Sequence, residues 1–259
     1  MNDAAILEVK GVTKRFKGLV AVNKFDMLIR ERTIHSLIGP NGAGKTTLFN
    51  VISGIYRPEE GKVIFLGEDI TGRKPHVLVA KGIARTFQNL RIFPNLTCLE
   101  NVMSGQHCRG RCGTWSSIFR TPRQRAEERR IQEVAERWLE RTGLWEFRNE
   151  LAKNLPFGLR KMLELARALA TEPKLLLLDE PTTGLNDKEK EDIMEFIGGL
   201  PEMGITVLLV EHNMNVVMGI SERITVMDMG EKIAEGTPEE IYNDPRVIEA
   251  YLGREEAVA

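Results

Sequence analysis

The chain has 259 residues, which is long enough for one large α/β domain with a smaller subdomain. Its 42% hydrophobic and 28% charged residues are typical of an ordinary globular protein. A formal net charge of −1 creates no global field that would attract nucleic acid or an anionic membrane, so we expect no nucleic-acid partner.

No stretch of the sequence predicts membrane insertion. Residues 1–5 lack the basic start and the apolar stretch of a signal peptide. No apolar run approaches the ~20 residues needed to cross a bilayer. If the protein serves a membrane, we therefore expect it to dock to another protein.

The first 38 residues predict three strands. Residues 6–16 and 19–29 mix apolar and β-branched side chains on either side of Lys17-Gly18, which indicates two antiparallel strands joined by a turn. Residues 33–38 predict a third, buried strand that leads into a glycine-rich segment.

That segment, residues 39–46, fills the pattern G-x-x-x-x-G-K-[ST] at every required position, and residues 47–53 predict a helix after it. The glycines allow backbone N–H groups to point at phosphate oxygens, and the helix N-terminus adds partial positive charge. Lys45 would reach the β- and γ-phosphates, and the Thr46 hydroxyl would bind Mg²⁺. The sequence predicts a nucleoside-triphosphate site whose phosphate-binding residues are Gly39, Pro40, Asn41, Gly42, Ala43, Gly44, Lys45, Thr46 and Thr47.

Three more elements are predicted before residue 90. Gly54 ends the helix, and residues 62–66 form a short strand. Residues 76–81 are predicted to be helical, and residues 83–87 form a strand that runs into Gln88.

The sequence changes character between about residue 89 and residue 155. Residues 108–120 are rich in Gly, Arg and Ser and predict an irregular insertion. Thr121-Pro122-Arg123-Gln124 predicts a capped helix start. The helix after it has an apolar stripe at Ile131, Val134, Ala135, Trp138 and Leu139. We interpret 91–157 as a helical subdomain inserted into a nucleotide-binding core of residues 1–90 and 158–259.

The charged, histidine and cysteine side chains of this insertion do not by themselves predict a binding site. We interpret the Arg- and Glu-rich helix face as solvated, although Arg109, Arg111, Arg120, Arg123 and Arg125 could also lie near lipid headgroups. His107, Cys108 and Cys112 have no evident fourth partner and fit no zinc spacing, so we expect no metal there. With Cys98 the cysteines number three, which indicates a reducing compartment without a disulfide framework.

The last hundred residues alternate helices and strands. The run 175–178 is entirely leucine and predicts a strand that is buried on both faces. The other predicted elements are helices at 159–170 and 187–200, a strand at 205–210, a hairpin of 224–227 and 232–234 around Gly230, and a capping box at 237–240 that opens a short helix.

Polar residues follow two of these strands. Asp179 and Glu180 end the leucine strand, where one carboxylate can hold Mg²⁺ and the next can polarise an attacking water. His212 follows the strand 205–210, and parallel-sheet geometry would bring it to the same edge of the sheet. An imidazole there could donate a hydrogen bond to the γ-phosphate.

Taken in order, these motifs resemble the ATP-binding subunit of an ABC transporter over nearly the whole chain. They are the phosphate loop, Gln88, a signature segment at 155–159, the strand 175–180, a loop at 184–187 and His212. Arg85-Thr86-Phe87-Gln88, Glu180-Pro181-Thr182-Thr183-Gly184-Leu185-Asn186 and Val210-Glu211-His212-Asn213-Met214 resemble the branched-chain (hydrophobic) amino-acid uptake systems.

The resemblance implies a P-loop NTPase core of the α/β class, with an antiparallel β subdomain and an inserted α-helical subdomain. It implies ATP and Mg²⁺ as cofactors. Phe16 would stack on adenine, and Thr46, Gln88 and Asp179 would serve the metal. Glu180 would be the general base and His212 the γ-phosphate sensor.

The resemblance also implies partners. ATP would lie between two ATPase subunits, and Gly158 of the signature segment would contact the nucleotide of the opposite subunit. A transmembrane permease would dock beside Gln88 and the helical subdomain, on the cytoplasmic face of the membrane, and a periplasmic or extracellular binding protein would deliver cargo. The alternatives are a urea or amide importer, a lipid exporter and a non-transport ABC protein.

One motif departs from the family pattern. The usual Leu-Ser-Gly-Gly-Gln is Leu155-Pro156-Phe157-Gly158-Leu159 here, and proline offers neither the serine hydroxyl nor an N–H. A hydrogen bond to a charged group contributes ~1.5–3 kcal/mol, so one ATP site would be weakened about ten- to a hundredfold. Pro156 could instead simply open the helix. The sequence thus suggests a heterodimer in which this chain's own loop carries most of the hydrolysis.

Overall fold

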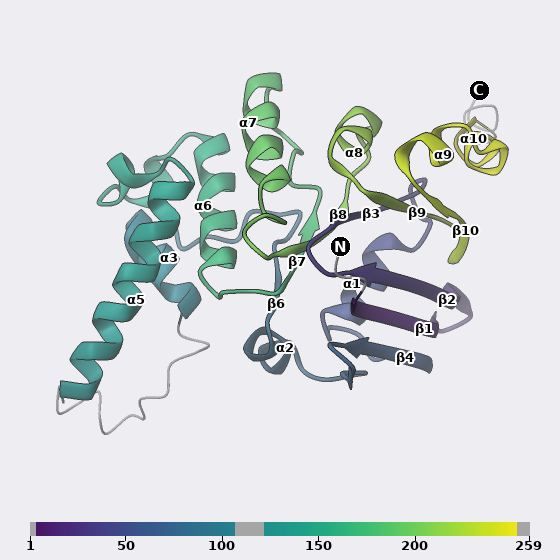
Figure 1. Cartoon of the computed structure of the whole chain (residues 1–259), viewed down its shortest axis with the longest axis horizontal. Coiled ribbons are helices and arrows are strands. Elements are labelled where there is room, and N and C mark those ends of the chain that lie inside the picture. The colour runs from purple at the N-terminus through teal and green to yellow at the C-terminus, as the bar shows by residue number, and fades with distance from the viewer. Residues whose placement is uncertain (1–3, 107–121, 253–259) are drawn as a thin grey trace.

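The computed structural model describes residues 4–106 and 122–252 of the chain. Figure 1 shows two sheets packed beside each other, with helices covering the larger one. The larger sheet has the strand order β10-β9-β3-β8-β7-β6, and all its strands except β10 run parallel to their neighbours. Its strands are β3 (Ile34–Ile38), β6 (Ile83–Arg85), β7 (Leu175–Asp179), β8 (Thr206–Val210), β9 (Arg223–Asp228) and β10 (Glu231–Gly236).

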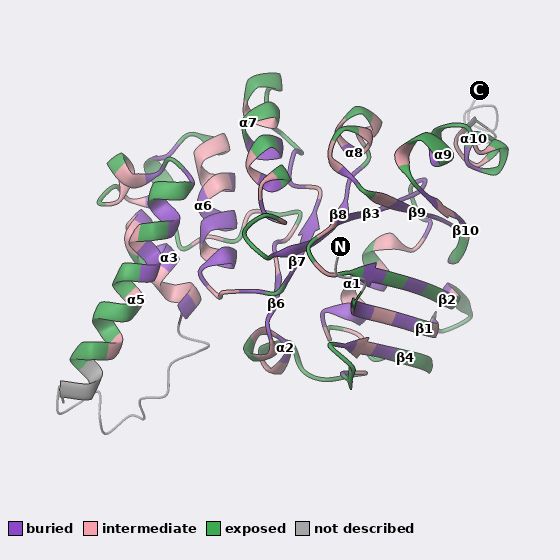
Figure 2. Cartoon of the chain, in the orientation of Figure 1, coloured by how far each residue is buried: buried purple, intermediate pink, exposed green. Residues whose placement is uncertain are grey.

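The central strands of this sheet are buried on both faces, as the leucine run predicts. Leu175 and Leu177 of β7 pack into one hydrophobic core, and Leu176 and Leu178 pack into another on the opposite face. Figure 2 shows these strands in purple between helices whose outer faces are green. Because neighbouring parallel strands end at the same edge, their carboxyl ends can gather polar residues from distant parts of the chain.

The second sheet is antiparallel, with the order β2-β1-β4-β5. It consists of β1 (Ala5–Phe16), β2 (Leu19–Arg30), β4 (Glu60–Phe65) and β5 (Glu68–Asp69). The predicted pairing of the first two strands is confirmed, with Phe16 opposite Leu19 across the turn. The phosphate-loop helix α1 (Lys45–Ile52) shares one hydrophobic core with both sheets, which fixes the loop between them. A short helix, α2 (Pro75–Lys81), precedes β6.

A helical layer covers the other face of the larger sheet. It contains α3 (Cys98–Gln106), α5 (Pro122–Arg141) and α6 (Phe157–Leu169), which share one core with α7 (Asp187–Gly198). Of the predicted stripe of α5, Val134, Ala135, Trp138 and Leu139 are buried, and Ile131 is half-buried. The predicted insertion 108–120, the side chains of the 121–124 cap, His107, Cys108 and Cys112 lie outside the described residues, as do Arg109, Arg111, Arg120 and the side chain of Arg123.

Helix α3 has no counterpart among the sequence predictions. Two of its buried positions are polar, and both pair with backbone carbonyls. Asn101 donates to the carbonyls of Phe93, Leu96 and Thr97, and Gln106 donates to the carbonyl of Ala170. Such buried polar residues interrupt the apolar periodicity from which a helix is predicted.

The C-terminal region completes the fold with α8 (Met214–Ile220), α9 (Pro238–Tyr242) and α10 (Pro245–Leu252). The predicted hairpin around Gly230 and the predicted capping box, in which Thr237 and Glu240 bond each other's backbone N–H groups, are both confirmed. Helices α8 and α10 were not predicted from the sequence. In the described parts of the chain, every helix is too short or too polar to span a bilayer.

Candidate functional site

The carboxyl ends of β3, β8 and β7 form the edge at which the predicted site residues gather. The phosphate loop follows β3, His212 follows β8, and Glu180 follows β7. The Glu180 N–H donates to the Val210 carbonyl at 2.9 Å, which extends the pairing of β7 with β8 beyond the strands. We call this region the catalytic edge.

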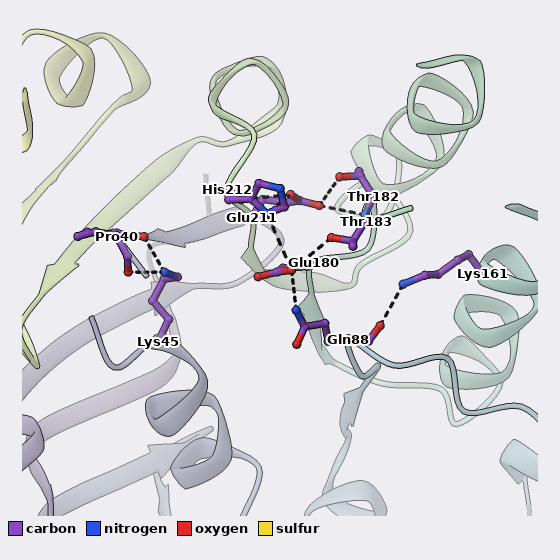
Figure 3. Close-up of polar contacts among 10 residues, drawn as sticks. Pro40, Lys45, Gln88, Lys161, Glu180, Thr182, Thr183, Glu211 and His212 are labelled. Atoms are coloured by element: carbon purple, nitrogen blue, oxygen red, sulfur yellow. Dashed lines mark hydrogen bonds and ion pairs between the residues drawn. The ribbon is translucent and has the colours of Figure 1, made fainter. Parts of the chain in front are cut away.

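The phosphate loop is held tightly against its neighbours. Gly44 has φ 107°, and a Cβ there would overlap the Ala21 carbonyl of β2. The Lys45 ammonium lies over the loop and donates to the carbonyls of Gly39 at 2.6 Å and Pro40 at 2.9 Å (Figure 3). Gly44 caps α1 without a side-chain hydrogen bond, and the N-terminus of a helix favours an anion.

Phe16 lies at the end of β1 with 38% of its surface exposed. Its ring meets the Tyr56 ring edge-on, with 5.1 Å between centroids. The Lys14 ammonium lies 5.3 Å from the Phe16 centroid. An exposed aromatic ring held in this way offers a surface on which a flat base can stack.

Glu180 is the centre of a hydrogen-bonded cluster that Figure 3 shows. One of its carboxylate oxygens, Oε2, accepts from Gln88 Nε2 at 2.9 Å and from Thr183 Oγ1 at 3.2 Å. His212 Nδ1 lies 3.9 Å from the same oxygen. Glu180 has φ 49°, a backbone conformation that is uncommon for residues other than glycine and recurs at functional sites. The structure thus brings together the three residues predicted to act in catalysis.

Asp179 forms a buried ion pair that the sequence did not predict. Its Oδ2 accepts from Arg85 Nη2 at 2.9 Å, and the two side chains are 7% and 8% exposed. Arg85 also donates to Asn50 Oδ1 at 2.7 Å and to Ser53 Oγ at 2.8 Å, both on α1 or at its end. Burial raises the pKa of Asp179, and the Arg85 guanidinium opposes that shift. The carboxylate is therefore tied to the end of the phosphate-loop helix.

The residues predicted to hold Mg²⁺ have suitable donor atoms. Magnesium prefers oxygen ligands, and Thr46, Gln88 and Asp179 offer a hydroxyl, an amide carbonyl and a carboxylate. Thr46 is exposed at the start of α1, and Gln88 uses its amide nitrogen, not its oxygen, for the bond to Glu180. The donor set fits the metal.

The signature segment lies apart from this cluster. Pro156 occupies the N-cap of α6, one residue before the first helical position. A Cβ on Gly158 would overlap the Glu189 carboxylate, and Phe157 packs against Gly184. Within the described chain, no hydrogen bond or ion pair joins Gly158 to the phosphate loop, so the structure does not bring this predicted site residue to the others.

Several side chains of the catalytic edge were not assigned to the site from the sequence, because their spacing in the chain indicates no function. Arg85, Thr182, Thr183 and Glu211 all stand within motifs that resemble the amino-acid uptake systems. Lys161 of α6 is buried, and its Nζ donates to the Gln88 carbonyl at 3.4 Å. The motif resemblance could have drawn attention to Arg85, Thr182, Thr183 and Glu211, but Lys161 lies outside every quoted motif.

Comparison with known proteins agrees with this geometry. The model of the family "ABC transporter" matches residues 22–183, and that of the "Branched-chain amino acid ATP-binding cassette transporter" matches residues 231–257. A high-affinity branched-chain amino acid transport ATP-binding protein of Pseudomonas aeruginosa is 46% identical over 96% of this chain and 98% of its own length. The corresponding protein of Escherichia coli is 43% identical over the same shares.

A solved structure agrees as well. The ADP conformation of an ATP-binding cassette of an ABC transporter matches with a TM-score of 0.84 and 33% identity, covering 96% of this chain and 99% of that chain. The P-loop, the two-sheet core and the helical layer are thus those of an ATP-binding cassette. The chain belongs to the ABC transporter family and is an ATPase whose hydrolysis of ATP is coupled to transport.

Proposed function

We propose that this chain is the ATPase subunit of an importer of branched-chain or other hydrophobic amino acids. The observation that carries the proposal is the Gln88–Glu180–His212 cluster at the sheet edge that also carries the phosphate loop. The cargo class is supported by the family match at residues 231–257 and by relatives that resemble this chain over nearly its full length.

Each site residue has its own role in binding or hydrolysing ATP. The loop from Gly39 to Thr47 binds the ATP phosphates, and Phe16 stacks on the adenine. Mg²⁺ would be held by Thr46, Gln88 and Asp179, and it would neutralise negative charge on the phosphates. Glu180 accepts the proton of the attacking water through Oε1, because Oε2 already accepts hydrogen bonds from Gln88 and Thr183. His212 donates to the γ-phosphate.

The subunit works within an assembly. We place it on the cytoplasmic face of the membrane, docked to transmembrane permease subunits, with an extracellular or periplasmic binding protein supplying the cargo. A second ATPase subunit provides the signature segment that completes the ATP site of this chain. Pro156 lacks the hydrogen-bond donors of the usual serine, so the signature segment that this chain contributes to the partner's ATP site is weaker. We therefore propose that the partner is a different polypeptide.

The cargo is tested in vesicles that contain the complete transporter and its binding protein. We expect leucine, isoleucine and valine to stimulate ATP hydrolysis severalfold and to accumulate inside. Urea, short amides and lipids serve as comparison cargoes. Stimulation by one of those, with no response to the amino acids, would overturn the proposed cargo but not the ATPase activity.

A further inference from the structure

Glu211 is a charged side chain that the roles assigned so far leave without a function. It follows β8 directly, and its side chain is fully buried. An unpaired buried carboxylate is strongly unfavourable unless hydrogen bonds or an opposite charge compensate it. Among the described residues, no lysine or arginine forms an ion pair with Glu211, and the nearest ionisable nitrogen is His212 Nδ1 at 3.9 Å.

The hydrogen bonds of Glu211 join two loops of the catalytic edge. Its Oε1 accepts from the Thr182 N–H at 3.0 Å and from the Thr182 hydroxyl at 2.6 Å. Its Oε2 accepts from the N–H of His212 at 3.2 Å. Figure 3 shows Glu211 between His212 and the segment that carries Thr182 and Thr183.

Both joined segments carry catalytic groups. Thr182 precedes Thr183, whose hydroxyl donates to Glu180 Oε2 at 3.2 Å. His212 has a side chain that is 62% exposed, so contacts with neighbouring side chains restrain it little. The position of its imidazole therefore depends strongly on its backbone, which Glu211 holds.

We propose that Glu211 is a positioning residue that fixes the distance between His212 and Glu180. A carboxylate is suited to this task because both of its oxygens accept hydrogen bonds, and all three donors that face it are N–H or O–H groups. The proposal rests on the catalytic roles of Glu180 and His212 proposed above.

The test replaces Glu211 by glutamine in the full transporter. The amide keeps the shape but presents an NH₂ donor to one of the N–H groups, so at least one hydrogen bond to a buried carboxylate is lost. We expect kcat to fall about ten- to a hundredfold, with the KM for ATP changed less than about threefold. Glu222→Gln, an exposed glutamate beyond α8, is the matched control and should keep wild-type kcat.

A second pair of variants covers the case in which Glu211→Gln does not fold. Thr182→Val removes the hydroxyl that donates to Glu211, and Thr182→Ser retains it. We expect a reduced kcat for the valine variant and recovery to within about twofold of wild type for the serine variant. A lower melting temperature with unchanged kcat in folded Glu211→Gln or Thr182→Val would overturn the proposal, since it would show a merely structural role.

Failure of the catalytic roles has a different signature. If Glu180→Gln and His212→Ala retain wild-type kcat, the roles of those two residues are wrong, whatever the Glu211 variants do. If both lose activity and the Glu211 and Thr182 variants do not, only the positioning role is wrong.

Discussion

The catalytic edge and the start of α6 differ in how their polar groups are used. At the edge, Glu180 and Glu211 each accept hydrogen bonds both from their own segment and from a residue of another segment. At the start of α6, Pro156 has no side-chain donor, Phe157 is 38% exposed and Gly158 packs on Glu189. The difference is the basis of our proposal that this chain has a complete hydrolytic site of its own and contributes a poorer surface to its partner's site.

The largest effect is expected at Glu180, the proposed general base. Glu180→Gln removes the proton acceptor but keeps the bonds from Gln88 and Thr183 possible, so the ATPase rate should fall about 10²- to 10⁴-fold. Steady-state kinetics of the full transporter measures the loss. The matching change in the partner ATPase should cost much less, and equal losses would contradict the asymmetry between the two sites.

The next largest effect is expected at the buried ion pair of Arg85 with Asp179. Arg85→Met leaves the buried Asp179 carboxylate unpaired, so the free energy of unfolding should fall by about 3–5 kcal/mol. Arg15→Met is the control, because its ion pair with Glu60 is exposed and should contribute at most about 1 kcal/mol. Chemical denaturation compares the two variants. Similar losses would show that Arg85 is not needed to hold the carboxylate.

A pH effect is expected from His35 of β3, the strand that leads to the phosphate loop. Burial lowers its pKa to about 4, and its Nε2 lies 2.7 Å from Thr225 Oγ1. In the unfolded chain the pKa of His35 is about 6.5. Between pH 4 and pH 6.5 the unfolded chain therefore binds more protons at His35 than the folded chain does. Stability should therefore be unaffected by His35 above about pH 6.5 and should fall by up to about 3 kcal/mol towards pH 4.

Replacing His35 separates this contribution from that of other groups. His35→Gln should flatten the decline in stability below pH 6.5, whereas His76→Gln, at an exposed position of α2, should leave it unchanged. Urea denaturation at a series of pH values measures both. An unaltered decline in the His35 variant would assign the pH dependence to other residues.

The smallest effect is expected at the start of α6. The Cβ added by Gly158→Ala would overlap the Glu189 carboxylate. This carboxylate caps α7 by accepting a hydrogen bond from the Asn186 N–H at 3.0 Å. The carboxylate can move away only if this hydrogen bond is lost. The free energy of unfolding should therefore fall by about 1 kcal/mol. In a Glu189→Ala background the same change should cost almost nothing, because the overlap is gone. Additive losses would contradict the contact.

The local features of this protein could be predicted from its sequence. The phosphate loop, the leucine strand and the capping box at Thr237 each depend on residues that are close together in the chain, since backbone geometry and periodicity are local properties. The positions of Glu180 and His212 at one edge also followed, because parallel strands end together. Helix α3 was missed where buried Asn101 and Gln106 broke the pattern.

Only the tertiary structure decided which side chains pair across that edge. Arg85 and Asp179 are 94 positions apart, and Thr182 and Glu211 are 29 apart, so no local spacing connects them. The strand order β8-β7-β6 puts Arg85 beside Asp179, and the end of β8 puts Glu211 beside Thr182. The sequence by itself determined the chemistry that the phosphate loop and Glu180 can perform. The sheet topology decided which buried charges hold that chemistry in place, because the partner of a buried charge is set by strand neighbours and not by neighbours in the chain.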